Sequence, residues 1–281
     1  DIREDTLNIN ENLIEELISE KTKAIIPVHY AGVSCNMDEI KKIADKYNLL
    51  VIEDAAQGIL SKYQNKPLGS LGDLGCFSFH ATKNIVSGEG GAITINNIKF
   101  AERAEIIREK GTNRSLYLRG QVDKYTWVDV GSSFLPNELT AAFLIAQLKA
   151  SKYITDERLL IWNYYHINFE DLENEGLVRR PIIPKDCTHN AHLYYLILKD
   201  SNIRDKFIFE MKRRDIQCTF HYVPLHSSPF YKSQYCIEDE NKFTVTNDLS
   251  SRIVRLPLWV GINKFQDKII ENVIDVIKLL N

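Results

Sequence analysis

The chain has 281 residues, with 35 lysines and arginines and 38 aspartates and glutamates, for a net charge of −3. Hydrophobic residues make up 44% and charged residues 26%, which is typical of a globular protein and excludes a disordered one. There is no basic excess for nucleic-acid binding, and the length predicts about two domains. No apolar run approaches the ~20 residues that span a bilayer, and no signal-peptide pattern opens the chain. We therefore expect a cytoplasmic protein with no nucleic-acid or membrane partner.

The cysteines are widely spread and form no CxxC pair, so they predict neither a zinc site nor a disulfide framework. Scattered free thiols are typical of the reducing cytosol, where most cysteines are simply buried or idle. They are Cys35, Cys76, Cys187, Cys218 and Cys236.

The first 52 residues predict a βαβ unit. Asn10 is a plausible N-cap for a helical pattern near the start, and residues 24–28 predict a short buried strand. A helix capped by Asp38 follows through Tyr47, and residues 49–52 form another continuous apolar strand. Continuously apolar strands predict a parallel sheet that is covered on both faces.

The middle of the chain predicts two more strands, at residues 76–79 and 92–95, and a charged helix over 99–110. Residues 111–133 are polar, aromatic and irregular, and this stretch is too long for an idle connector in a compact domain. A long helical pattern starts at Pro136 and is expected to link two domains.

The remainder predicts a smaller α+β domain. Its strands are expected at 194–198 and 216–220, and its helices at 203–213, 241–254 and from 264 onward.

Chemistry-bearing side chains follow two of these strands. Glu53 and Asp54 come directly after an apolar strand, at the end where open α/β sheets place their ligands. Ser78 and Lys83 follow the next strand, before a glycine-rich turn. Taken alone, Asp54 is as well explained as a helix N-cap, and Lys83 as a solvated surface residue. The glycines lead into a strand rather than a helix, which excludes a dinucleotide-binding fingerprint.

Pyridoxal phosphate (PLP) chemistry accounts for both groups together. It requires a lysine amine, an acid at the pyridine nitrogen, and hydroxyls or amides around the phosphate. Lys83, Asp54 and Ser78 supply these parts, and a freed lysine can also move a proton.

The segments VIEDAAQ (51–57), GCFSFHATKN (75–84) and GEGGAI (88–93), in this order, resemble the DegT/DnrJ/EryC1/StrS sugar aminotransferases. The resemblance runs along essentially the whole chain. It implies the α/β fold of type I PLP-dependent aminotransferases and a homodimer. The large PLP-binding domain, with a mostly parallel sheet, is then expected in residues 1–150. A linker helix and the small C-terminal α+β domain are expected in residues 151–281.

The resemblance also assigns roles to four residues. Lys83 matches the lysine that forms the Schiff base with PLP, and Asp54 matches the carboxylate at the pyridine nitrogen. Gln57 matches a residue that contacts the cofactor ring and its hydroxyl, and Ser78 matches a phosphate ligand. No metal is expected.

Residues 109–114 and 119–127 are similar to the branch of the family that makes dTDP-4-amino-4,6-dideoxygalactose for enterobacterial common antigen. This similarity implies transamination of a dTDP-4-keto-6-deoxyhexose, with L-glutamate as the amino donor. The reaction would serve cell-surface polysaccharide synthesis, including enterobacterial common antigen or the O-antigen of lipopolysaccharide.

Candidate substrate-binding residues lie in two loops. Cationic side chains of the first loop are candidates for contacts with the substrate diphosphate, or are simply solvated: Arg114, Arg119 and Lys124. His221 and Tyr222 belong to a segment that resembles a family loop near the sugar nucleotide, and a packed polar loop is the alternative.

Two parts of the family pattern are missing. Members of the family have a further N-terminal segment, with a turn that binds the PLP phosphate and an aromatic residue that stacks on the ring. We therefore expect an N-terminally truncated enzyme. Within the loop 131–137, members place an Asn or Arg that reaches the partner's cofactor phosphate. Here Ser132, Ser133 and Asn137 are the alternatives.

Two rival functions remain. Related PLP-dependent sugar dehydratases have a histidine in place of the lysine, so Lys83 argues against dehydration. A truncated, non-catalytic remnant that binds only a sugar nucleotide or a partner protein is the other.

Overall fold

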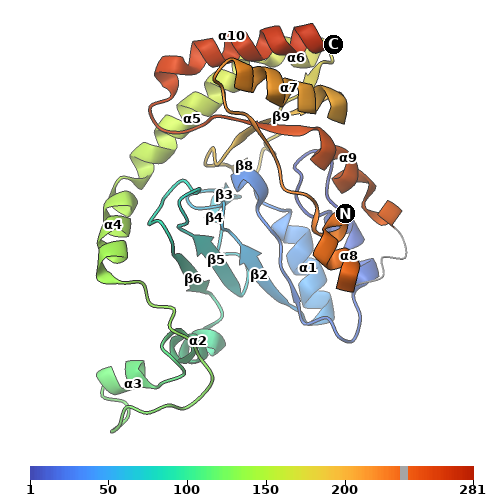
Figure 1. Cartoon of the computed structure of the whole chain (residues 1–281). Helices are drawn as coiled ribbons and strands as arrows, with labels where there is room; N and C mark the ends of the chain where they lie inside the picture. The colour runs from blue at the N-terminus through green and yellow to red at the C-terminus, as the bar shows by residue number, and fades with distance from the viewer. Residues whose placement is uncertain (235–239) are drawn as a thin grey trace.

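The N-terminal half is built on a four-stranded sheet in the order β1-β2-β5-β6, seen in a computed structural model that describes residues 1–234 and 240–281 (Figure 1). The strands are β1 (Ala24–Ile25), β2 (Leu50–Asp54), β5 (Leu74–Ser78) and β6 (Gly91–Ile95). β1, β2 and β5 run parallel, and β6 is antiparallel to β5. The predicted mostly parallel sheet is therefore confirmed, and the carboxyl ends of β2 and β5 lie next to each other.

Helix α1 (Met37–Tyr47) covers one face of this sheet and confirms the predicted βαβ unit. Ile40, Ile43 and Ala44 pack on Val51 of β2 within one buried cluster. The N-cap differs from the expectation. The side chain of Asn36, rather than Asp38, accepts the hydrogen bond from the Glu39 amide, and Asp38 lies in the first turn.

The helix expected near the start of the chain is replaced by two short 3₁₀ helices, Glu11–Leu13 and Glu15–Leu17. Asn10 does cap the first of them, by accepting from the Asn12 amide at 3.1 Å. Leu17 is 78% exposed, so the segment has no continuous apolar face to bury. Without that packing, a longer helix gains little stability.

A small antiparallel sheet links the two halves of the chain. It consists of β3 (Lys62–Tyr63) and β4 (Lys66–Pro67), with β8 (Cys187–Thr188) paired to β3. The sequence pattern did not predict these two-residue strands.

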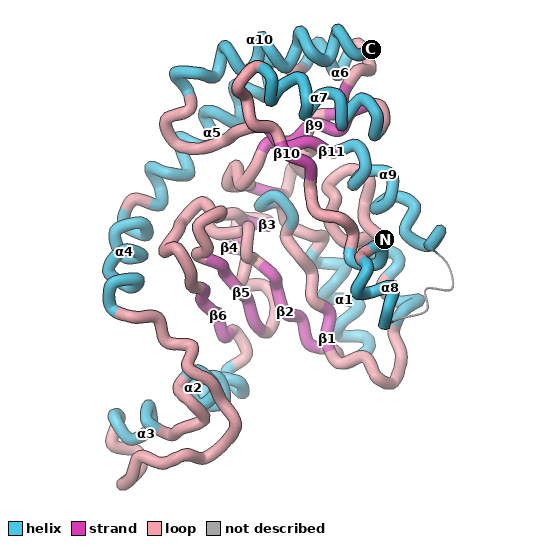
Figure 2. Tube along the Cα trace, viewed as in Figure 1, coloured by secondary structure: helices cyan, strands magenta, loops and turns pink. Residues whose placement is uncertain are grey.

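The segment that follows β6 extends away from both of these sheets (Figures 1 and 2). It contains α2 (Ala101–Arg108), α3 (Arg114–Leu118) and a long loop that leads to α4 (Glu138–Lys149). We call residues 101–149 the arm. The long helix expected from Pro136 is two helices, because the chain leaves helical geometry at Ala150 before α5 (Ser151–Asn168).

The C-terminal half contains an antiparallel sheet in the order β10-β11-β9-β7. Its strands are β7 (Val178–Arg179), β9 (Tyr194–Leu198), β10 (Thr219–Phe220) and β11 (Ile253–Leu256). The helices of this half are α5, α6 (Glu170–Asn174), α7 (Ser201–Arg213), α8 (Pro229–Gln234), α9 (Thr244–Arg252) and α10 (Asn263–Leu280).

Two boundaries in this half differ from the prediction. The helix expected to reach residue 254 ends at Arg252, because Ile253–Leu256 pairs with β9 as a central strand. β10 begins at Thr219 rather than at residue 216. Ile216 instead packs, buried, in the core that α7 and α10 share.

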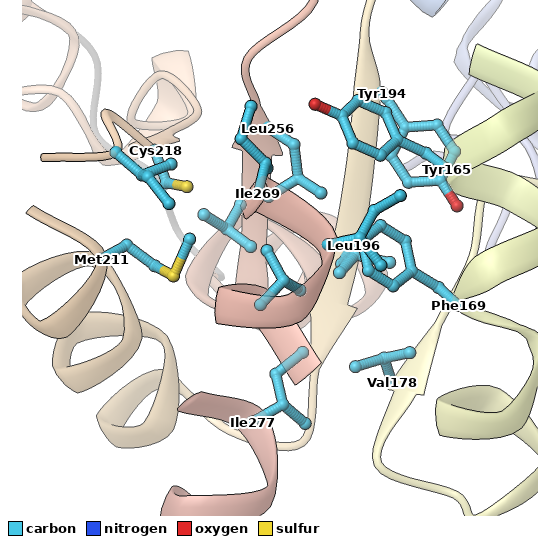
Figure 3. Packing of buried hydrophobic residues seen from close by; sticks show 14 of the residues in the cluster. Tyr165, Phe169, Val178, Tyr194, Leu196, Met211, Cys218, Leu256, Ile269 and Ile277 are labelled. Carbon is cyan, nitrogen blue, oxygen red and sulfur yellow. The ribbon is translucent and has the colours of Figure 1, made fainter. Parts of the chain in front are cut away.

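Alternation along β9 and β11 divides their side chains between two cores. Tyr194, Leu196, Val254 and Leu256 belong to the larger core, under α5, α7 and α10 (Figure 3). Ile253 belongs to a second core with residues of the N-terminal half, including Leu7 and Ala31. The boundary predicted between residues 150 and 151 stays a prediction.

Across the described ranges, no helix is both long enough and apolar enough to cross a membrane. Cys35, Cys76, Cys187 and Cys218 are free thiols, and the expectation for Cys236 lies outside the described residues.

Candidate functional site

Asp54 and Lys83 lie near each other at the carboxyl ends of two neighbouring parallel strands. Asp54 ends β2 and is in register with Cys76 of β5. Lys83 follows β5 in a closed turn, in which its amide donates to the His80 carbonyl at 2.9 Å. The Ala81 amide closes the turn by donating to the carbonyl of Gly88, whose φ is +83°. The structure thus brings the two predicted catalytic-site residues to one edge of the sheet.

The environment of Lys83 favours a reactive amine. Burial lowers the pKa of Lys83 from its ordinary value, and the negative charge of Asp54 partly restores it. The Lys83 side chain is half-buried. A lysine with a lowered pKa exposes more of its neutral, nucleophilic form at neutral pH.

Gln57 holds the neighbouring turn. Its Oε1 accepts a hydrogen bond from the Ala31 amide at 2.7 Å, and Ala31 has a φ of +56° that is unusual for a residue with a side chain. The adjacent Gly32 has a φ of +80°, and a Cβ there would lie 2.1 Å from Asn190 Oδ1. Gln57 therefore has a structural role that sequence reasoning missed, and its predicted contact with the cofactor stays a prediction.

Ser78 is the last residue of β5 and is half-buried. Its hydroxyl accepts weakly from the His80 amide, at 3.4 Å, and stays available for an anion. Its role as a phosphate ligand stays a prediction.

Glu53 is the main residue of this region to which the sequence assigned no role. It is fully buried and accepts hydrogen bonds from the amides of Gly69, Leu71 and Gly72 at 2.6–2.7 Å. His29 Nε2 also donates to Glu53, at 3.0 Å, since the Cys35 amide donates to His29 Nδ1. Burial alone would raise the pKa of Glu53, but the bonds from His29, Gly72 and Gly69 hold it below its ordinary value.

Residues just before β9 connect this site to the C-terminal half. Asn190 Nδ2 donates to the carbonyls of Gln57 and Ile59, both at 2.8 Å. Asn84, next to Lys83, donates to the Asn190 carbonyl and bonds His192 Nδ1 at 3.0 Å. Burial is the main cause that lowers the pKa of His192 to about 3, so its ring is neutral at pH 7.

A cavity of about 680 Å³ opens between Lys83 and the C-terminal half. His192 lines it, together with Arg158 of α5, Arg255 of β11 and Lys268 of α10. Its volume is in the range of small-molecule sites. The sequence pattern did not single out these C-terminal residues, because they come from separate segments and carry no motif.

The three cationic loop candidates lie in the arm, and none of them lines the cavity that contains Lys83. Arg114 is paired with Glu109, and Arg119 is paired with Glu105 through two bonds of 2.7 and 2.9 Å. Lys124 is exposed in the loop after α3. Within one chain, the structure does not bring these residues to the Lys83 cavity, and their role stays a prediction.

His221 and Tyr222 line a different hollow, of about 370 Å³, beside Tyr30. The His221 ring contacts Tyr30 edge-on at 5.1 Å, and burial together with the charge of Arg255 lowers its pKa to about 4. Tyr222 is 82% exposed. Their substrate-binding role also stays a prediction.

In the part of the chain that the structure describes, no three His, Cys, Asp or Glu side chains gather as a set of metal ligands.

Comparisons with known proteins identify relatives of this chain. The model of the DegT/DnrJ/EryC1/StrS aminotransferase family matches residues 1–278. The chain is 32% identical to the spore coat polysaccharide biosynthesis protein SpsC of Bacillus subtilis, over 99% of this chain and 72% of that protein. It is 34% identical to the dTDP-3-amino-3,6-dideoxy-alpha-D-galactopyranose transaminase of Aneurinibacillus thermoaerophilus, over 90% of this chain and 65% of that protein.

The structure also superposes on a solved one, the PLP-form of Spr1654 from Streptococcus pneumoniae, which is described as a sugar aminotransferase. The TM-score is 0.89 at 24% identity, over 100% of this chain and 75% of that chain. The predicted aminotransferase fold is confirmed.

Replacing Glu53 with glutamine is expected to lower the free energy of unfolding by about 2–3 kcal/mol, because buried amides lose a charged acceptor. Chemical denaturation monitored by circular dichroism measures the change. Glu16→Gln, at an exposed residue, is the matched control and should change stability by less than about 0.5 kcal/mol. Equal effects of the two substitutions would contradict the role given to Glu53.

Replacing Asp54 with asparagine is expected to lower the pKa of Lys83 further, because the ammonium loses a nearby negative charge. Reductive ¹³C-methylation of the lysines, followed by an NMR pH titration, measures this pKa. Asp45→Asn, at an exposed position on α1, should leave it unchanged. Titration of Lys83 together with the exposed lysines, near about 10.4, would contradict the assignment.

Proposed function

Because the chain belongs to the DegT/DnrJ/EryC1/StrS aminotransferase family, we propose that it uses PLP at Lys83 to transfer an amino group to a nucleotide-linked keto sugar. The observation that carries this proposal is the half-buried Lys83, whose pKa is lowered, beside the Asp54 carboxylate. Both side chains lie where an α/β sheet places its ligands.

The residues present fit PLP. When bound, the cofactor supplies an aldehyde that accepts amino groups and a ring that withdraws electrons. Lys83 would hold the aldehyde and then carry a proton, and Asp54 would keep the pyridine nitrogen protonated. Gln57 already uses Oε1 on the Ala31 amide, which leaves its Nε2 for the cofactor. Ser78 would donate its hydroxyl to the phosphate.

We propose a dTDP-4-keto-6-deoxyhexose as the acceptor, L-glutamate as the donor and dTDP-4-amino-4,6-dideoxygalactose as the product. The Aneurinibacillus relative, by its name, handles a dTDP-linked dideoxygalactose that is aminated at C3. Amination at C4 would require a substrate whose carbonyl is at C4 instead of C3, and the same residues would serve either substrate. The name of SpsC, a spore coat polysaccharide biosynthesis protein, supports a role for this enzyme in cell-surface polysaccharide synthesis. We also propose that the enzyme is cytoplasmic.

We also propose that the enzyme is a homodimer in which the arm contributes to the interface. Several apolar side chains of α4 are exposed to solvent: Leu139, Phe143, Ile145 and Leu148. Exposed apolar surface of this kind typically marks a protein interface. A second copy would also give the cations of the arm, and the loop 131–137, a route to a cofactor site.

Purified chain mixed with PLP is expected to show a visible absorption band, which L-glutamate bleaches. Borohydride should fix the cofactor on Lys83, as peptide mapping would show. Lys83→Ala should abolish the band and all turnover while circular dichroism stays unchanged. Lys41→Ala, at an exposed lysine of α1, is the control and should keep both.

Labelling of a lysine other than Lys83, or wild-type turnover by Lys83→Ala, would overturn the proposal. NMR of the sugar product then decides between amination at C4 and at C3. A product aminated at C3 would replace the proposed substrate while leaving the transaminase itself in place.

Replacing Phe143 with glutamate is expected to weaken the dimer by at least tenfold, because a charge would be buried in an apolar interface. Sedimentation velocity over a concentration series measures the dissociation constant. Leu279→Glu, at a 69% exposed leucine of α10, is the control and should leave it unchanged. A wild-type chain that stays monomeric, or an unchanged Phe143→Glu dimer, would contradict the proposal.

A further inference from the structure

The imidazole of His192 is bonded to the turn that carries Lys83. Asn84, which directly follows Lys83, contacts His192 Nδ1 through its side-chain Oδ1 at 3.0 Å. The Nδ2 of the same amide donates to the carbonyl of Asn190 at 2.8 Å. Because that carbonyl can only accept, the amide nitrogen faces it and the amide oxygen faces His192. His192 Nδ1 therefore carries a hydrogen and donates it to Asn84.

This bond determines which nitrogen of the His192 ring remains free. The ring is neutral at pH 7, because burial, with smaller contributions from nearby positive groups, lowers the pKa of His192 to about 3; these groups are Arg158, Lys83, Arg255 and His221. A neutral imidazole with its hydrogen on Nδ1 has a lone pair on Nε2. No hydrogen bond within the described ranges uses this Nε2, which is not a buried atom. Since His192 lines the cavity that contains Lys83, the ring offers an unused acceptor there.

The backbone holds His192 in place at a conformational cost. Ala191 has a φ of +50°, in the left-handed region that a residue with a side chain rarely adopts. Arg158 donates to the carbonyls of Ala191 and His192 at 3.0 and 2.6 Å, which stabilises this conformation. Strained backbone of this kind persists only where surrounding contacts enforce it, and it is concentrated at functional sites. The protein thus fixes the orientation of a ring whose Nε2 contributes nothing to the fold.

The Lys83 amine is a donor that matches this acceptor. Within the described ranges the amine forms no hydrogen bond and no ion pair. The positive charge of Lys83 acts on the His192 ring, and the negative charge of Asp54 acts on Lys83, so the amine lies within range of both. The flexible four-carbon stem of a lysine allows its amine to turn from one neighbour to the other. A neutral acceptor can bind the lysine both as an ammonium and as a neutral amine, since both forms carry N–H groups.

We propose that His192 is a positioning residue for Lys83, whose amine donates a hydrogen bond to His192 Nε2 whenever the lysine is free of cofactor. The inference rests on the proposed transaminase function, in which a freed Lys83 carries a proton. A lysine that returns a proton to a defined atom reacts faster when its amine is held in place. The ring accepts the hydrogen bond without taking the proton, because its low pKa prevents it from competing as a base.

The first test is a pH titration of the cofactor-free chain by NMR, with ¹⁵N-labelled histidine. His192 should carry its hydrogen on Nδ1 and none on Nε2 throughout the neutral range. The Nε2 signal should move in one step whose midpoint equals the pKa of Lys83, because the hydrogen bond weakens as the ammonium loses its proton. The step should vanish in Lys83→Met, which keeps an apolar stem but has no amine.

The second test uses two substitutions that separate the bond to Lys83 from the bond to Asn84. Asparagine can place an amide N–H near the position of Nδ1, whereas glutamine can place an amide oxygen near that of Nε2. His192→Asn is therefore expected to lower the pKa of Lys83 by about 1, which is the loss of a hydrogen bond to a charged group. His192→Gln should restore part of this difference. The ¹³C-methyl NMR titration of the lysines measures the pKa.

His166→Asn, at a half-buried histidine of α5 outside the cavity, is the control and should leave the pKa of Lys83 unchanged. Three results would overturn the assignment: a hydrogen on Nε2 in place of Nδ1, an Nε2 signal that ignores the titration of Lys83, or an unchanged pKa of Lys83 in His192→Asn. A lower melting temperature of His192→Asn with that pKa unchanged would place His192 in the fold alone. Should this variant fail to fold, the titrations of the wild-type chain and Lys83→Met decide.

These titrations need no PLP, so they separate this proposal from the transaminase function. A wild-type chain without the visible band would contradict the proposed function, and the titrations would still decide whether His192 binds Lys83. Where the band forms, His192→Asn should keep it and should slow its bleaching by saturating L-glutamate at least about tenfold. The L-glutamate concentration that gives half the maximal rate should stay unchanged. Bleaching at the wild-type rate would contradict the positioning role.

Discussion

The buried carboxylate of Glu53 is the constraint on which the geometry of the site depends. It binds the loop 69–72 through three backbone amides and the turn after β1 through His29. Both segments are thereby fixed around the end of β2. Because neighbouring residues of a strand point in opposite directions, a Glu53 held on one side places Asp54 on the other. Glu53, which stabilises the structure, and Asp54, which we propose binds the cofactor, are thus adjacent in sequence but point in opposite directions.

A second set of bonds ties the reactive lysine to the C-terminal half. Asn84, beside Lys83, bonds both His192 and the carbonyl of Asn190, and Asn190 returns to the turn that contains Gln57. Arg158 then holds the same segment through the carbonyls of Ala191 and His192. Displacement of β9 would consequently disturb both Lys83 and Gln57. The cavity is a joint property of the two halves, and neither half would form it alone.

The sequence predicted what depends on local patterns. The apolar strands before Asp54 and Ser78, the helix before β2 and the strand Tyr194–Leu198 were all visible in the pattern, since each is continuous or periodic. The sequence did not predict features that tertiary contacts determine. The helix predicted over 241–254 included Ile253 and Val254, yet pairing with β9 makes Ile253–Leu256 a strand. Glu53 was seen as a second carboxylate with no role, because its partners lie 16–24 residues away along the chain. Arg255 had no motif at all.

The charged residues that have hydrogen-bond partners stabilise the fold, whereas those without an ion-pair partner line the candidate site. Glu53 accepts hydrogen bonds from His29 and from backbone amides, and the Arg158 guanidinium donates to backbone carbonyls. Both residues therefore stabilise the fold. Lys83 and Arg255 are partly buried, and neither forms an ion pair within the described residues. Such groups cost stability in the free protein, and binding of a ligand that supplies the missing partner recovers it.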